Sequence, residues 1–142
     1  MLSDTAMLGL SMRFAVVVDG VDLGGWATCA GLAVTFNLVE RTEGGVNDRT
    51  VWLPGRIKYP KVTLTRAMTA PDSAKVMKWL SSMIDKDRGG TAKITLFDAH
   101  NEEVSSWSLQ NVLPWAWTGP TLNATSKDVA VEKLELVHEG FL

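Results

Sequence analysis

Short segments in which apolar and polar residues alternate recur along this chain, and a single segment has the spacing of a helix. Residues 34–41 and 104–110 alternate as a strand does when one face meets a core and the other meets water. Residues 13–19 are apolar at consecutive positions, which predicts a strand buried on both faces. A chain of 142 residues is long enough for one domain with its own core. The pattern predicts a mainly β fold with one α-helix, in which two sheets form a small barrel or sandwich and the helix flanks them.

The end of the chain is expected to be a strand over residues 129–138, and its alternation breaks once. The valines at its start follow one phase, whereas Leu134 and Leu136 follow the other. Either a β-bulge lies near Glu132 or both faces of the strand are covered. Further strands are expected over residues 61–66, 92–97 and 104–110, and a turn at 98–101 joins the last two.

The helix is expected to begin near Thr69, which forms a capping-box-like pair with Asp72 around Pro71, and to end at Gly89. An apolar stripe that should cover a sheet consists of Val76, Met77, Leu80, Met83 and Ile84, with Trp79 at its edge. The polar side of the helix, which should face outward, consists of Lys75, Lys78, Ser82 and Lys86.

Residues 40–60 form a long segment rich in glycine, proline and charge that nevertheless contains large apolar side chains. A loop of this length is usually functional or disordered, and disorder fits poorly with so many aromatic residues. We interpret the segment as an arm that buries Trp52, Leu53, Pro54 and Tyr59 against another chain. The alternative is a long hairpin folded back over its own core.

Small polar residues on one face of several strands indicate a second kind of surface. Thr35 and Asn37 lie opposite the apolar side of one expected strand, and Ser106 and Ser108 lie opposite that of another. One helix cannot cover so many half-polar faces, so we interpret these four residues as a candidate wall around a water-filled space.

The chemical inventory argues against catalysis. His100 and His138 have no metal-ligand spacing around them, and Cys29 has no evident catalytic partner. The glycine pairs are not followed by helices, and neighbouring carboxylates such as Glu132 and Glu135 are expected to be solvated. We therefore expect no enzyme activity, no cofactor and no metal.

Tryptophan is unusually frequent, with six residues beside one tyrosine. Trp115 and Trp117 are expected to share one face of a strand, where two indoles could stack on sugar rings. Burial between subunits is the competing explanation, because tryptophan supplies a large contact area at small entropic cost. The neighbours Pro114, Ala116 and Gly119 offer no polar side chains for sugar hydroxyls, which favours the interface.

Charge and composition exclude other classes. The net charge is −2 and the basic residues are scattered, which predicts no specific nucleic-acid binding. One cysteine excludes an internal disulfide and suits a reducing cytoplasm. The N-terminal segment 1–11 lacks the leading basic residues of an export signal, and no apolar run approaches the roughly 20 residues that cross a bilayer, so direct membrane insertion is not expected.

Several short motifs occur in a specific order: RFAVVVDG, EGG, LPG followed by KY, VTLTRA, ITLFDAHNEEVSSWSLQNVLP, GP followed by LNA, and VAVEKLELVHEG. With these motifs the chain resembles the tail-tube proteins of contractile phage tails and extracellular contractile injection systems, and the resemblance spans residues 12–142. The resemblance implies a tail-tube domain over residues 1–142, six subunits in a ring, and a barrel lumen that continues across subunits. Ring closure has a physical reason, because it pairs the sheet edges that would otherwise aggregate.

The resemblance also implies partners. Stacked rings would form a tube inside a sheath, and the polar side of the helix would face that sheath. The tube would begin at a spike hub or baseplate through a tube initiator, end at a terminator or cap with a tape-measure protein, and hold cargo in its lumen. Assembly is expected in the bacterial cytoplasm, with release by lysis as part of a particle. The alternatives are a tube initiator ring and, in another class, a carbohydrate-binding β-sandwich module.

Overall fold

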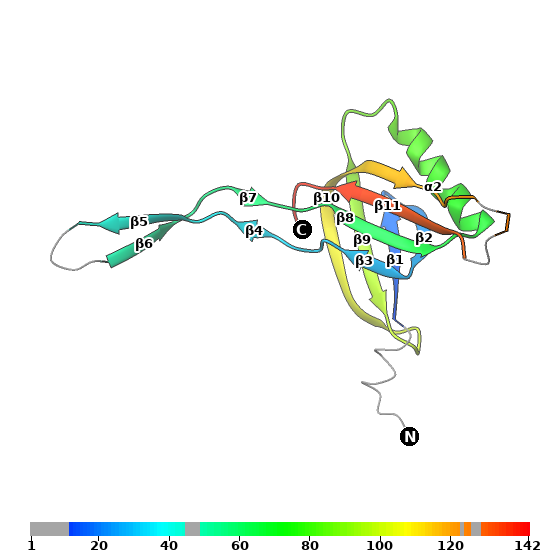
Figure 1. The fold of residues 1–142 in the computed structure, drawn as a ribbon, viewed down its shortest axis with the longest axis horizontal. Helices are drawn as coiled ribbons and strands as arrows, with labels where there is room; N and C mark the ends of the chain where they lie inside the picture. The colour runs from blue at the N-terminus through cyan, green and yellow to red at the C-terminus, as the bar shows by residue number, and fades with distance from the viewer. Residues whose placement is uncertain (1–11, 45–48, 123, 126–128) are drawn as a thin grey trace, which may run out of the picture.

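The computed structural model describes residues 12–44, 49–122, 124–125 and 129–142 (Figure 1). Within these residues the chain is mainly β with one helix, as the alternating pattern predicts. The elements are β1 (Arg13–Val18), β2 (Val21–Trp26), β3 (Thr28–Ala30), β4 (Thr35–Phe36), β5 (Val39–Glu43), β6 (Arg49–Leu53), β7 (Ile57–Lys58), β8 (Val62–Ala67), α2 (Ala70–Met83), β9 (Gly90–Phe97), β10 (Glu103–Thr118) and β11 (Val131–Val137).

Seven strands form one continuous ladder in the order β2-β1-β9-β10-β11-β8-β3. The long strand β10 belongs to two sheets, because its first half pairs with β9 and its second half pairs with β11. It turns the corner at Asn111, where φ is +49° and the register with β9 shifts. At the opposite corner only Ala27 separates β2 from β3. The first sheet is therefore β2-β1-β9-β10, the second is β10-β11-β8-β3, and hydrogen bonds do not close the ladder.

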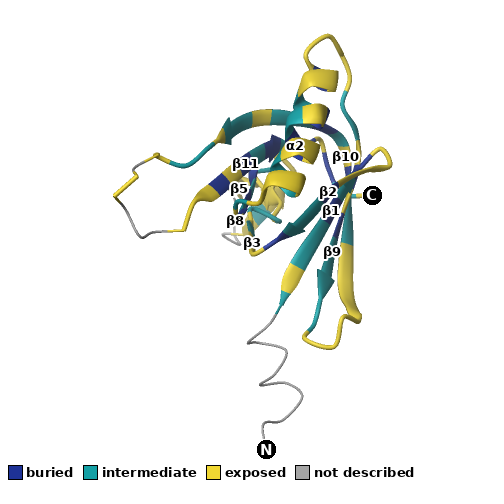
Figure 2. Cartoon of the chain, turned by 90° about the vertical axis from the view of Figure 1, so that its right-hand side faces the viewer, coloured by how far each residue is buried: buried dark blue, intermediate teal, exposed yellow. Residues whose placement is uncertain are grey.

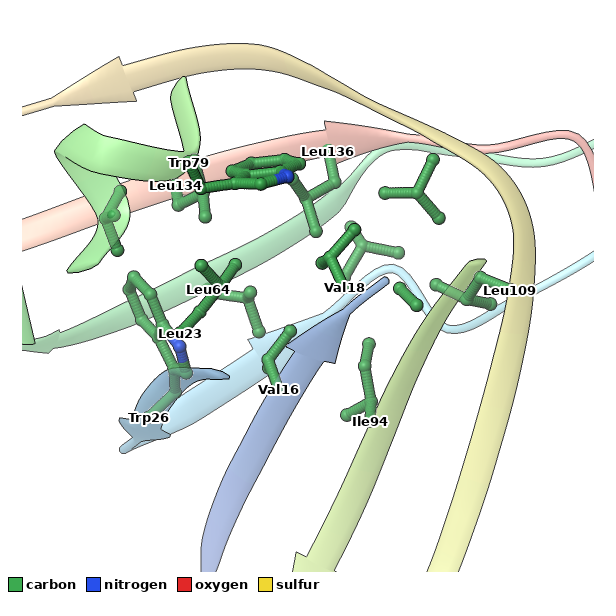
Figure 3. Packing of buried hydrophobic residues seen from close by; sticks show 14 of the residues in the cluster. Val16, Val18, Leu23, Trp26, Leu64, Trp79, Ile94, Leu109, Leu134 and Leu136 are labelled. Atoms are coloured by element: carbon green, nitrogen blue, oxygen red, sulfur yellow. The ribbon is translucent and has the colours of Figure 1, made fainter. Parts of the chain in front are cut away.

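The core lies between the two sheets, where the alternating side chains of both point inward (Figure 3). Its fully buried members include Val16, Ile94 and Leu109 from the first sheet and Leu64 and Leu134 from the second. Burying such side chains stabilises the fold by about 1.5–3 kcal/mol each. Only one face of β1 is fully covered, because Val17 is half-buried, so the prediction that both of its faces are buried is wrong.

The helix α2 lies beside β2 and β10 and ends earlier than the pattern predicts, at Met83. Its inward side places Val76, Trp79 and Met83 in the core, and Trp79 lies near Leu134 and Leu136 (Figure 3). Trp79 is 3% exposed and is thus central to the stripe instead of lying at its edge. Ile84 follows the last helical turn and is 80% exposed, and Thr69 makes no side-chain capping hydrogen bond, so both of these predictions are wrong.

A bulge near Glu132, one of the two causes expected for the break in alternation, does not occur in the last strand. β11 pairs with β8 in continuous register from Val131 to Leu136. The irregularity lies in β10, between Pro114 and Ala116. Glu132 occupies the inward phase of β11 and is 0% exposed, so a buried carboxylate stands where the pattern would place an apolar residue.

Candidate functional site: the assembly surfaces

The arm of this protein comprises the described residues 35–44 and 49–58 and extends from the body as a narrow ribbon (Figure 1). It consists of two short antiparallel ladders, β4 with β7 near the body and β5 with β6 beyond them. The arm begins before residue 40, so residues 34–41 are not a core strand as their alternation predicts. Phe36, for example, is 60% exposed, and Val34 and Leu38 are exposed too.

Both faces of the outer ribbon present large apolar side chains. Val39 pairs with Leu53 on one face, and Glu40 pairs with Trp52 on the other. Trp52 is 59% exposed and Leu53 is 39% exposed. A two-stranded ribbon has no core of its own and is at best marginally stable in water. These two predicted contact residues therefore face opposite directions, and a single flat surface could cover only one of them.

The joint between the two ladders depends on Pro54 and Gly55. Pro54 is exposed and lacks the N–H that a continuing ladder would use. The amide of Asn37 donates to the carbonyl of Arg56 at 2.9 Å. A Cβ added to Gly55 would lie 1.8 Å from the carbonyl oxygen of Asn37, so no larger residue fits this crossing. Asn37 and Thr35 consequently belong to the arm.

Tyr59 lies at the root of the arm and not on its projecting part. Its ring centroid lies 5.1 Å from that of His138 and 5.9 Å from that of Phe141, and the side chain is half-buried. The amide of Gln110 donates to the carbonyl of Gly140 at 2.9 Å, which holds the end of the chain on β10. Tyr59 thus fastens the arm to the body within one protomer.

Ser106 and Ser108 lie on the outer face of the first sheet. The register places Ser106 beside Thr95 and Ser108 beside Lys93, and the inward residues of the same strands alternate with them. This face continues across β1. The four residues of the predicted wall therefore divide into two separate places, the serines on this sheet and Thr35 with Asn37 on the arm.

The polar side of the helix is exposed, as its spacing predicts (Figure 2). Lys75 lies 3.8 Å from the carboxylate of Asp72, three residues earlier on α2. The hydroxyl of Ser82 donates to the carbonyl of Trp79 at 2.6 Å, and Lys78 is exposed. Lys86 is exposed beyond the end of the helix.

A buried ionic cluster connects four elements of the body. Arg66 on β8 is 4% exposed, and its Nε donates to Glu132 Oε1 on β11 at 2.5 Å. The same guanidinium donates to the carbonyls of Leu23, Gly25 and Asp72 at 2.7, 3.2 and 3.0 Å. It thereby joins β2 and α2 to the second sheet, and a buried charge is tolerated only with partners of this kind.

Sequence reasoning missed this cluster, although a signal was present. Arg66 shares the inward phase of Val62 and Leu64, and Glu132 shares that of Leu134. The two charged residues are direct neighbours in the ladder between β8 and β11. Opposite charges that both fall on the apolar phase of neighbouring strands therefore indicate a buried pair, and the expectation that Glu132 is solvated is wrong.

Trp115 and Trp117 do not form a shared flat surface on which a sugar could stack. The bulge between Pro114 and Ala116 interrupts the period-two alternation at Trp115. Trp115 is exposed with the Lys61 ammonium 4.5 Å from its ring centroid, whereas the half-buried Trp117 donates its indole N–H to Glu132 at 3.1 Å. One indole faces solvent and the other closes the ionic cluster.

The thiol of Cys29 is protonated at neutral pH. Burial raises the pKa of the Cys29 thiol to about 11, which leaves the thiolate scarce at neutral pH. His100 lies in the exposed turn between β9 and β10. In the part of the chain that the structure describes, no group of three or more His, Cys, Asp or Glu side chains is arranged to hold a metal ion. No helix among those residues is long and apolar enough to cross a membrane.

Comparison with known proteins finds one family model and several solved structures similar to this chain. The model of the T4-like virus tail tube protein gp19 family matches residues 10–142. A chain of the extracellular contractile injection system PVC, in its extended sheath-tube complex, is 24% identical over 92% of this chain and 86% of that chain, with a TM-score of 0.73. A chain of the anti-feeding prophage baseplate is 21% identical over 92% and 90%, with a TM-score of 0.70.

A more distant likeness is Hcp1 from Flavobacterium johnsoniae, which is 10% identical over 89% of each chain with a TM-score of 0.50. No curated protein matches the sequence. The structural likenesses show the same fold, and the family model spans nearly all of the sequence. The chain therefore belongs to the family of T4-like virus tail tube proteins, as the order of its sequence motifs indicates.

Proposed function

We propose that this protein is the inner-tube subunit of a contractile injection system or phage tail, in which copies form hexameric rings that stack into a hollow conduit. Membership of a tail tube family supports the tube, and the six-fold ring with its continuous barrel is the specific form that we infer. The subunit is structural and has no catalytic role. It would assemble in the bacterial cytoplasm and leave the cell by lysis, within the particle.

The observation on which this proposal rests is the two-faced arm. Exposed apolar side chains on a ribbon mark a protein contact. Because Leu53 and Trp52 point to opposite sides, the arm would lie between two other surfaces, such as a neighbour in the same ring and a subunit of the next ring. An arm that docks on a different surface of an identical copy makes a heterologous contact, and such contacts build rings and filaments.

The open ladder supports the ring in the same way. β2 and β3 are the edge strands of the seven-stranded ladder. Edge strands present unpaired backbone groups, and a ring that pairs or covers them removes this hazard.

Substitutions on each face of the arm test the proposal. We expect Trp52→Ala and Leu53→Ala, made separately, each to leave a folded protomer and to abolish rings or stacks, because central aromatic and apolar anchors dominate interface energy. Circular dichroism reports the fold, and negative-stain microscopy and sedimentation report the assembly. Thr50→Ala, on the same face as Trp52, is the matched control and should assemble normally.

Two outcomes would contradict the arm contact. If both anchor variants form normal tubes, the arm joins no subunits. If either variant unfolds, its residue instead stabilises the protomer, which is the behaviour of a hairpin packed on its own core.

The outer face of the first sheet is our candidate for the lumen wall, together with Thr35 and Asn37 if the arm of a neighbour reaches it. Small polar side chains such as Ser106 and Ser108 would give cargo a wet and weakly interacting surface. Cysteines at Ser106 and, for comparison, at Thr65 on the outer face of the second sheet test this orientation in a Cys29→Ser background. In assembled tubes, a lumen-facing thiol should react with small reagents and not with bulky ones. If Thr65→Cys behaves in this way and Ser106→Cys does not, the other sheet forms the wall.

The partners follow from the proposed tube. Sheath subunits would contact the exposed lysines of α2, a baseplate or spike hub would hold the first ring through an initiator, and a cap or terminator with a tape-measure protein would set the length. A tube initiator is the second candidate, and copy number in purified particles separates the two roles. A tube subunit should be as abundant as the sheath subunit, whereas an initiator would supply one or two rings.

A further inference from the structure

His138 connects the root of the arm to the end of the chain. Its ring lies 5.1 Å from Tyr59 and 5.3 Å from Phe141, measured between centroids. Tyr59 directly follows β7, the returning strand of the arm, and Phe141 forms a β-bridge with Leu109 of β10. The imidazole therefore contacts both the arm root and the end of the chain, and Tyr59 also contacts Phe141 directly, with ring centroids 5.9 Å apart.

The hydrogen bonding of His138 requires a neutral ring. The amide of Gly140 donates to His138 Nδ1 at 3.1 Å, so Nδ1 must offer a lone pair and the proton must lie on Nε2. Nε2 is buried and has no hydrogen-bond partner among the described residues, and the side chain is 8% exposed. A protonated ring would point a second N–H at the amide of Gly140 and would place a charge beside the rings of Tyr59 and Phe141. Both changes disfavour the present arrangement.

We propose that His138 is an acid-sensitive latch for the arm: the neutral imidazole holds Tyr59 and Phe141 in one cluster, and protonation releases Tyr59 and loosens the arm root. The latch rests on the proposed function, because a loosened arm affects assembly only if the arm joins subunits. Tyr59 itself reports on the latch whether or not tubes form.

The sign of the pH effect follows from burial, which lowers the pKa of His138 below its ordinary value of 6.5. A backbone hydrogen bond favours the charged imidazole when the ring donates it, but here Gly140 is the donor, so this bond also favours the neutral ring. The unfolded chain therefore takes up the proton first. The native contacts lose stability as the pH falls below 6.5 toward the lowered native value.

The charged side chains near His138 do not offset the effect of burial on the pKa of its imidazole. Lys58 and Lys61 flank Tyr59 in the chain and Glu139 follows His138, and all three side chains are exposed. β10 contributes the neutral Gln110 on its side. His138 takes part in none of the ion pairs among the described residues.

The composition of the chain makes the latch measurable, because Tyr59 is its only tyrosine and His138 is one of two histidines. We expect the fluorine resonance of fluorotyrosine-labelled full-length protein to shift with a midpoint below 6.5, together with the imidazole resonances of His138. His138→Asn keeps an acceptor for the Gly140 amide without titrating, and His138→Phe keeps an aromatic ring. Tyr59 should be insensitive to pH in both variants, and His100→Ala, in the exposed turn, should respond as the wild type does.

Several results would overturn the proposed latch. A Tyr59 signal that stays constant while His138 titrates would overturn the latch, as would a response that persists in both His138 variants. Negative-stain microscopy at each pH adds the second readout, with tubes lost in acid for the wild type and retained for His138→Phe. Tubes that persist in acid while Tyr59 moves would overturn the latch as a control of assembly. If the full-length protein forms no tubes at any pH, the proposed function fails while the Tyr59 measurement still decides the latch.

Discussion

Glu132→Gln should destabilise the protomer severely, because it removes one charge from a buried pair with almost no change of shape. Glu132 is fully buried between Arg66 Nε at 2.5 Å and the indole N–H of Trp117 at 3.1 Å. The guanidinium of Arg66 stays charged after the substitution because arginine does not deprotonate in proteins. Leaving such a charge buried without its counter-ion costs about 3–5 kcal/mol.

The surroundings of Arg66 place the expected cost near the lower end of that range. The carbonyls of Leu23, Gly25 and Asp72 still accept its hydrogen bonds, and the Trp26 ring still lies 3.8 Å from the guanidinium carbon. The glutamine oxygen can also accept one bond. We therefore expect a loss of about 3 kcal/mol in the free energy of unfolding, which lowers Tm by roughly 6–12 °C in a chain of this size.

Urea unfolding of the unassembled protein, followed by tryptophan fluorescence, measures this loss. Glu135→Gln is the matched control, because Glu135 lies on the same strand with its face outward and pairs with Lys61 and Lys133 at 3.8 and 3.6 Å. Those lysines are half exposed, so the control should cost less than about 1 kcal/mol. Equal losses in the two variants, or a loss under about 1 kcal/mol for Glu132→Gln, would refute the reasoning.

Three further predictions concern the arm, the helix and the thiol. Gly55→Ala should leave the body folded and prevent assembly, because its Cβ would lie 1.8 Å from the Asn37 oxygen. A Cβ on Gly44 would meet none of the described residues within 4 Å, so Gly44→Ala should assemble, and microscopy compares the two. Reversing the charge of Lys75 and Lys78 should weaken sheath binding in a pull-down and leave naked tubes intact, and lysines found on the lumen side would contradict the assigned orientation. Cys29 should resist alkylation at neutral pH in the folded protein and react after unfolding, because its thiol has a pKa of about 11; equal rates would contradict its burial.

The sequence predicts those parts of the fold whose burial is internal to the protomer. Val62 and Leu64 on β8 and Ile94 on β9 alternate with outward residues in the sequence, and all three are fully buried. The 3.6-residue spacing predicts the helix, but it predicts an end beyond Met83 because Gly89 is a stronger stop signal than any residue at the true end. The exact end of a helix depends on how the following turn packs, which local spacing does not encode.

The arm shows a limit of a different kind. Phe36 and Leu38 alternate with polar residues as well as any core strand does, yet they are exposed on the projecting ribbon. Alternation indicates that one face of a strand is to be covered, but it does not indicate which chain covers it. Alternation therefore predicts a core strand over residues 34–41 and groups Thr35 and Asn37 with the serines of a sheet, from which the structure separates them.

The arrangement of the candidate contact residues is limited in the same way: their residue types can be predicted from the sequence, but the face of the ribbon on which each lies cannot. Trp52 and Leu53 are adjacent in sequence, which suggests a single apolar contact. In the β-ladder, however, they lie on opposite faces. A single docking surface could bury only one of them, so the ribbon leaves a large apolar side chain in water unless two surfaces approach it. In the proposed stack of rings, an arm would meet two surfaces, one from a neighbour within the ring and one from the next ring, whereas an isolated dimer would supply one. The two opposite apolar faces of the ribbon therefore support our proposal of a continuing stack over a closed pair, a distinction that the amino-acid composition of the arm does not make.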